Sequence, residues 1–160
     1  WGHVMVAIGV CLIPYVGAMP FADYVSMAPL ALGSGVMEVG REILVCAGDI
    51  EGDRQAGFRT VPVRMGQRTS LLVALGFYVA SVPLFYLYLP GLARFVPGLR
   101  GDVFGPLYLF GTTVFLVVLF ALWAMVWRRP NWHSFEAYIR TGSRVAIFLY
   151  QLLLVSEALL

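Results

Sequence analysis

The chain has 160 residues, of which 60% are hydrophobic and 12% are charged. This charged fraction is about half that of an ordinary soluble domain, and the mean hydropathy is +0.82. The net charge of +2 comes from eleven arginines, no lysine and nine acidic residues. Such a balance excludes the broad basic surface of a nucleic-acid-binding protein. We therefore expect a membrane protein with no nucleic-acid partner.

Five apolar stretches predict five transmembrane helices. Residues 1–21, 69–93 and 103–127 contain no charged residue, and each is long enough for a helix to cross about 30 Å of hydrocarbon. Two further stretches are apolar but contain a few charged residues. The predicted fold class is an all-α integral membrane protein, with spans at about residues 1–21, 27–46, 69–90, 104–127 and 144–160.

Arginines in the predicted loops orient this bundle. Eight of them lie between the second and third spans or between the fourth and fifth, whereas two lie between the third and fourth. The positive-inside rule places the side with eight arginines in the cytoplasm. We therefore expect an integral protein of the cell membrane whose active site faces the cytoplasm. The eight residues are Arg54, Arg59, Arg64, Arg68, Arg128, Arg129, Arg140 and Arg144.

The second predicted span and the residues after it carry a line of acidic side chains. If one helix continues through them at about 100° per residue, four acids lie within about 80° of one another: Glu38, Glu42, Asp49 and Asp53. At about 1.5 Å per residue, the line runs about 22 Å toward the cytoplasmic interface. Ionisable groups inside a bilayer are costly and normally face a cavity or one another. We expect Glu38 and Glu42 to face a cavity or the acceptor substrate.

Asp49 and Asp53 are the candidate metal ligands. Their spacing places the two carboxylates one helical turn apart, with about 6 Å between the Cβ atoms. Two carboxylates at this distance repel each other unless a cation lies between them. Mg²⁺ is typically held by one or two carboxylates together with the phosphates of a substrate. The spacing therefore predicts a Mg²⁺ site that binds a phosphate ester, and the alternative is that both residues are solvated acids at the end of a helix.

Four arginines are candidate pyrophosphate ligands. Arg54, Arg59 and Arg64 follow the acidic pair at intervals of five residues, and guanidinium groups can bind phosphate oxygens bidentately. Arg41 lies at the edge of the acidic line. We expect a loop of residues 50–68 to close over the ligand as a cytoplasmic cap. The alternative is that these cations serve only the positive-inside rule.

The motif over residues 41–66 resembles the second aspartate-rich motif of the UbiA superfamily of intramembrane prenyltransferases. In that superfamily, Asp-x-x-x-Asp is followed by a loop of the form Gly-x-x-Thr-x-Pro-x-x-x-Gly. The chain matches this pattern with Asp49-Ile50-Glu51-Gly52-Asp53 and then with Gly57, Thr60, Pro62 and Gly66.

This resemblance implies a fold, a cofactor and a reaction. Residues 1–160 look like the C-terminal part of a single transmembrane prenyltransferase domain, and the five spans look like the fifth to ninth helices of a nine-helix bundle. The implied reaction is the Mg²⁺-dependent transfer of a prenyl group from a prenyl pyrophosphate to a lipophilic acceptor in the lipid bilayer. The first motif of the superfamily, Asn-Asp-x-x-Asp, is absent, since Asn131 is the one asparagine in the sequence. We expect a missing N-terminal half with that motif, on a further segment or on another chain.

Within the superfamily, Arg41-Glu42-Ile43 upstream of the aspartate pair most resembles archaeal digeranylgeranylglyceryl phosphate synthases. That resemblance implies geranylgeranyl transfer to geranylgeranylglyceryl phosphate in archaeal lipid synthesis. Residues 45–48 depart from the Lys-Asp-Ile-Glu-Asp continuation common in those proteins. Two alternatives stay open: an aromatic prenyltransferase of the quinone, tocopherol or chlorophyll type, and a non-enzymatic transporter or channel fragment.

Overall fold

The computed structural model describes residues 2–18, 24–87, 89, 94–98, 105–136, 138 and 145. The regular elements in this part of the chain are all helices, as the composition predicts. They are α1 (Gly2–Ala18), α2 (Tyr24–Gly48), α3 (Ile50–Gln55), α4 (Val61–Met65), α5 (Gln67–Tyr86), α7 (Pro106–Arg128) and α8 (Trp132–Glu136).

Two of the described helices, α5 and α7, are long and apolar enough to cross a membrane. Helix α1 is apolar but has 17 residues, and α2 has 25 residues but contains Glu38, Arg41 and Glu42. The predicted span at residues 144–160 lies outside the described residues, except for residue 145. The count of five spans and their match to helices five to nine stay predictions.

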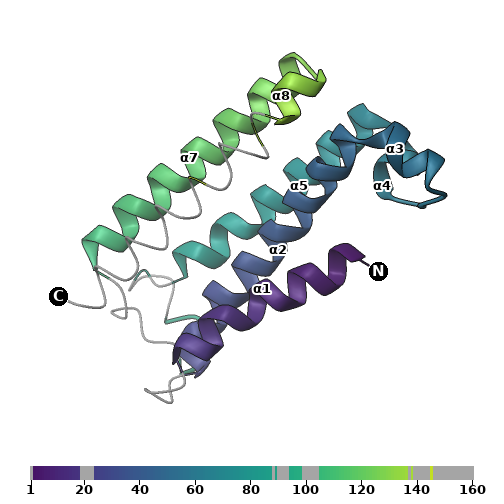
Figure 1. Cartoon of the computed structure of the whole chain (residues 1–160). Coiled ribbons are helices and arrows are strands. Elements are labelled where there is room, and N and C mark those ends of the chain that lie inside the picture. The colour runs from purple at the N-terminus through teal and green to yellow at the C-terminus, as the bar shows by residue number, and fades with distance from the viewer. Residues whose placement is uncertain are drawn as a thin grey trace.

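Helix α2 packs between α1 and α5 (Figure 1). Its glycines allow this close approach. A Cβ atom added at Gly40 would lie 3.0 Å from the Ala74 carbonyl oxygen and from the Tyr78 ring, and one added at Gly35 would lie 3.2 Å from the Ala7 carbonyl oxygen. Small residues that let backbones approach are typical of helix contacts in membranes, where lipid is as apolar as the side chains.

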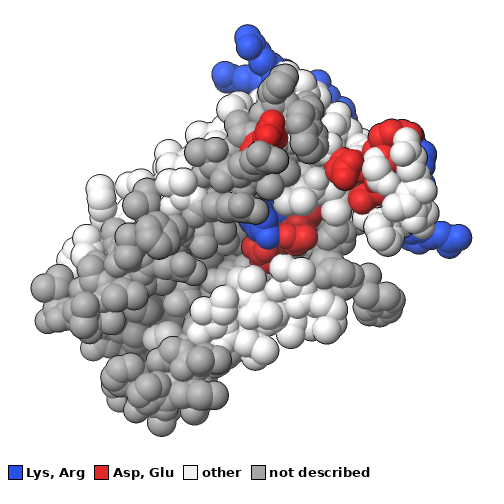
Figure 2. Space-filling model, in the orientation of Figure 1, with Lys and Arg blue, Asp and Glu red and all other residues white. Residues whose placement is uncertain are grey.

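Helices α5 and α7 run side by side, and α3, α4 and α8 lie at the same end of the bundle (Figure 1). Most basic atoms visible on one face also lie at that end (Figure 2).

Arg68, in the first turn of α5, donates from Nη1 to the Trp127 carbonyl oxygen at 2.9 Å, and its guanidinium lies 4.9 Å from the Trp127 ring centroid. Trp123 stacks on Trp127 and donates from Nε1 to the Leu71 carbonyl oxygen at 2.9 Å. These contacts join the N-terminal end of α5 to the C-terminal end of α7. Tryptophan and arginine side chains are typical of the membrane–water interface, so this end of the two helices is expected to lie there.

Replacing Arg68 by alanine is expected to lower the free energy of unfolding by about 1 kcal/mol, because an exposed cation–π contact and a hydrogen bond are lost. The measurement is denaturant unfolding of the purified protein in detergent micelles. Arg64→Ala is the matched control. Arg64 is exposed on the neighbouring short helix, so its removal should change stability by less than about 0.5 kcal/mol. Equal effects of the two substitutions would contradict a joining role for Arg68.

Candidate active site

Asp49 lies at a break between two helices. Helix α2 ends at Gly48 and α3 begins at Ile50. The Asp49 backbone has φ −127° and ψ 41°, which lies outside the helical region, and its N–H donates to the Cys46 carbonyl oxygen at 3.2 Å. The prediction of one unbroken acidic line is therefore wrong beyond Gly48, because the backbone at Asp49 redirects α3 away from the α2 axis (Figure 1).

The Asp49 carboxylate folds over the start of α3. A Cβ atom added at Gly52 would lie 2.8 Å from Asp49 Oδ2 and 2.9 Å from its Cγ. Contacts this short mean that any side chain at position 52 would push the carboxylate aside. The missing side chain of Gly52 therefore leaves space for the Asp49 carboxylate, and Asp49 is exposed.

Residues that follow α3 bind both the side chain and the backbone of Asp53. Thr60 Oγ1 donates a hydrogen bond of 2.9 Å to Asp53 Oδ2. The Phe58 backbone N–H donates to the Asp53 carbonyl oxygen at 2.8 Å. The Thr60 hydrogen bond orients the carboxylate, and the Phe58 hydrogen bond closes the following loop onto α3.

Two glycines allow the segment after α3 to turn. Gly57 has φ 75° and Gly66 has φ 81°, a left-handed conformation that glycine adopts without a steric cost. Thr60 is extended before α4, and Pro62 stands in the first turn of that helix, where a proline is well accommodated. Residues 50–68, which we expect to form a cap, thus contain the short helices α3 and α4 with tight turns beside them.

The chemistry of Asp49 and Asp53 fits Mg²⁺. Both supply carboxylate oxygens, the ligand type that Mg²⁺ prefers. Across the described ranges, no group of three or more His, Cys, Asp or Glu side chains gathers into a metal site. A Mg²⁺ ion held by this pair would therefore complete its coordination with phosphate oxygens and water, as Mg²⁺ commonly does. Metal binding by Asp49 and Asp53 stays a prediction.

The three arginines after the aspartate pair differ in their contacts. Arg54 Nη1 lies 2.9 Å from Glu51 Oε2, and the two side chains are 60% and 68% exposed, so this pair adds little to stability. Arg59 and Arg64 are exposed, and within the described part of the chain neither makes an ion pair or a side-chain hydrogen bond. Their guanidinium groups are the ones available to a ligand.

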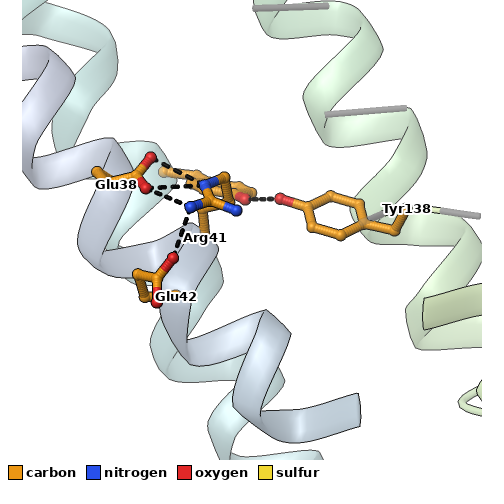
Figure 3. Close-up of polar contacts among 5 residues, drawn as sticks. Glu38, Arg41, Glu42 and Tyr138 are labelled. Atoms are coloured by element: carbon orange, nitrogen blue, oxygen red, sulfur yellow. Dashed lines mark hydrogen bonds and ion pairs between the residues drawn. The ribbon is translucent and has the colours of Figure 1, made fainter. Parts of the chain in front are cut away.

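An ion-pair network lies deeper along α2 (Figure 3). Arg41 Nε donates at 2.9 Å to both carboxylate oxygens of Glu38. Arg41 Nη2 donates to Glu38 and also to Oε1 of Glu42. The Glu38 side chain is 5% exposed, whereas those of Arg41 and Glu42 are 21% and 18% exposed. The structure thus brings these three side chains together, and their expected roles toward pyrophosphate and acceptor stay predictions.

A pair of tyrosines borders this network. The hydroxyl groups of Tyr78 in α5 and of Tyr138, just beyond α8, form a hydrogen bond with each other. Tyr138 points toward Arg41 (Figure 3), and burial raises the pKa of the Tyr138 hydroxyl, which keeps it protonated. No local pattern marks Tyr138 as a site residue, because its partner lies 60 positions away. Thr60 is likewise not among the predicted site residues, although its place in the Gly-x-x-Thr-x-Pro pattern is a signal that could have indicated it.

Three curated proteins are similar to the chain, and each is named digeranylgeranylglyceryl phosphate synthase. The protein of Natronomonas pharaonis is 36% identical over 114 residues, which cover 71% of this chain and 36% of that protein. The protein of Thermococcus gammatolerans is 26% identical over 151 residues, which cover 93% and 51%. The protein of Pyrococcus abyssi is 32% identical over 81 residues, which cover 51% and 29%.

The chain thus spans between 29% and 51% of the length of the curated relatives it matches. No protein-family model matches the chain, and no solved structure matches it significantly. The predicted resemblance to this group of archaeal proteins is confirmed by the three relatives.

Proposed function

We propose that this chain, which is related to the archaeal digeranylgeranylglyceryl phosphate synthases, forms part of a membrane enzyme with the same activity. That enzyme transfers a geranylgeranyl group from its pyrophosphate to geranylgeranylglyceryl phosphate, with the active site facing the cytoplasm. The observation that carries the proposal is the set of relatives that share this one name. The Asp49 and Asp53 pair supports it, since Gly52 leaves space for the Asp49 carboxylate and Thr60 donates a hydrogen bond to Asp53.

Separate groups of residues are proposed to bind the metal, bind phosphate and exclude water. Asp49 and Asp53 would hold Mg²⁺, which supplies electrostatic stabilisation to the pyrophosphate as it leaves. Arg59 and Arg64 bind the remaining phosphate oxygens, because their guanidinium groups have no other partner among the described residues. The apolar walls of α5 and α7 exclude water from the allylic carbon. A segment with the Asn-Asp-x-x-Asp motif completes the site.

The test is a transfer assay with the full-length protein that contains this chain, in detergent or lipid nanodiscs. Geranylgeranyl pyrophosphate is supplied with geranylgeranylglyceryl phosphate or with an aromatic acceptor, in the presence of Mg²⁺ or EDTA. The expected result is the diether product, detected by mass spectrometry, with the glycerol acceptor and Mg²⁺ only. Prenylation of the aromatic acceptor would favour the aromatic alternative, and no product with either acceptor would overturn the proposal.

The hydrogen bond from Thr60 to Asp53 yields a prediction on metal affinity. Thr60→Val is expected to raise the Mg²⁺ concentration for half-maximal activity by about 10- to 100-fold, because hydrogen-bond partners of metal ligands commonly contribute this much. The same weakening should appear in Mn²⁺ binding measured by electron paramagnetic resonance. Thr60→Ser keeps the hydroxyl and should behave like the original protein. Equal metal affinity in the valine and serine variants would exclude this role.

A further inference from the structure

The network of Glu38, Arg41 and Glu42 carries an unbalanced charge inside the bundle. Two carboxylates surround one guanidinium, so the three side chains together carry one negative charge when all are ionised. The nearby hydroxyl groups of Tyr78 and Tyr138 are neutral and bind each other. A net charge at membrane depth is costly, and residues that carry one normally serve a function. The residues proposed above to bind metal and phosphate do not include Glu38 or Glu42, so this charge has no assigned role.

The two carboxylates of the network are not equivalent. Both oxygens of Glu38 accept hydrogen bonds from Arg41, and the Glu38 side chain is 5% exposed. Glu42 contacts Arg41 through Oε1 alone, and its side chain is 18% exposed. Within the described residues, Oε2 of Glu42 accepts no hydrogen bond. Among the described residues, Glu42 is therefore the carboxylate of the pair with an oxygen that no donor occupies and that can receive a proton.

The depth of Glu42 matches the place where an acceptor would react. Glu42 precedes Asp49 by seven positions, and the intervening residues are helical to Gly48. Glu42 therefore lies about 10 Å from Asp49, toward the N-terminal end of α2. If the pyrophosphate binds at Asp49 and Asp53, its apolar chain extends toward the hydrocarbon. The allylic carbon, next to the phosphates on that side, then lies between the aspartate pair and the depth of Glu42. An attacking hydroxyl group approaches this carbon from the region of Glu42.

Formation of an ether bond requires a proton acceptor. The bond between the allylic carbon and the pyrophosphate oxygen breaks, and its electron pair leaves with the pyrophosphate. The acceptor hydroxyl oxygen then forms the new bond to that carbon, and the hydroxyl proton must leave. A positioned carboxylate that takes such a proton typically accelerates the step by about 10²- to 10⁴-fold.

We propose that Oε2 of Glu42 accepts the proton that the acceptor hydroxyl loses as the ether bond forms. The proton converts the network from a net charge of −1 to a neutral one, while Arg41 holds the Glu42 carboxylate through Oε1 and Glu38 holds Arg41. This inference rests on the proposed function, because it requires an acceptor with a hydroxyl group.

The test separates loss of pyrophosphate from capture of the prenyl group. Full-length protein with Glu42→Gln is supplied with both substrates and Mg²⁺, and released pyrophosphate, diether and free prenyl alcohol are quantified. Pyrophosphate release should persist, whereas the ratio of diether to prenyl alcohol should fall at least about 100-fold. Glu42→Asp retains a carboxylate and should restore part of this ratio.

Glu38→Gln is the matched control, because it disturbs the same network without removing the proposed proton acceptor. It should lower pyrophosphate release and diether formation together and leave their ratio unchanged. The proposal is overturned if Glu42→Gln keeps the original ratio, or if it loses pyrophosphate release and diether formation in equal measure. Failure of the proposed function is a different outcome, since the original protein would then form no diether.

Discussion

Asparagine in place of Asp49 or Asp53 is expected to abolish prenyl transfer by the full-length protein at every Mg²⁺ concentration. A neutral amide cannot offset the charge of the cation, and the paired carboxylate alone binds Mg²⁺ weakly in water. Residues that only orient a metal ligand commonly contribute up to about 100-fold to metal affinity or activity. Loss of a metal ligand itself should therefore lower activity by more than this factor. Diether formation is measured over a Mg²⁺ titration. Asp49 is exposed and Asp53 is half-buried, so both variants should fold.

Glu51→Gln is the control for this experiment. Glu51 lies between the two aspartates in the sequence, is exposed on α3 and contacts Arg54 and Gln55. The substitution removes one negative charge from the same region without changing a proposed ligand, so the Mg²⁺ requirement should be retained. Turnover close to normal in either asparagine variant would exclude metal binding by the pair and would favour solvated acids at a helix end.

Methionine in place of Arg41 is expected to lower the free energy of unfolding by about 3 kcal/mol, because it removes the partner of the buried Glu38 carboxylate. The variant leaves the carboxylates of Glu38 and Glu42 beside each other without the guanidinium that binds both. Unfolding in detergent micelles measures the effect. A loss below about 1 kcal/mol, as for an exposed ion pair, would contradict it.

The double variant Glu38→Gln and Arg41→Met is the control, because it removes one charge of each sign. It should recover part of the lost stability, and the coupling between the two positions follows from the cycle of single and double variants. The same variants test the predicted contact of Arg41 with pyrophosphate. An Arg41→Met protein of normal stability with weak pyrophosphate binding would favour that contact over a structural role.

Local patterns in the sequence were sufficient for the helical class and for the positions of several helices. The predicted spans at residues 69–90 and 104–127 correspond to α5 and α7, which begin and end within four residues of them. The motif over residues 41–66 was sufficient to indicate the archaeal relatives. Both inferences succeed because hydrophobic length and motif spacing depend on consecutive residues and not on what packs against them.

The partners of the polar side chains were decided by the tertiary structure. Helical periodicity assumed that α2 continues through Asp49, but the backbone breaks there and Asp53 is held by Thr60. Tyr138 meets Tyr78 across 60 positions. Such contacts depend on how separate helices pack and where their backbones turn, and no periodicity within one segment encodes that geometry.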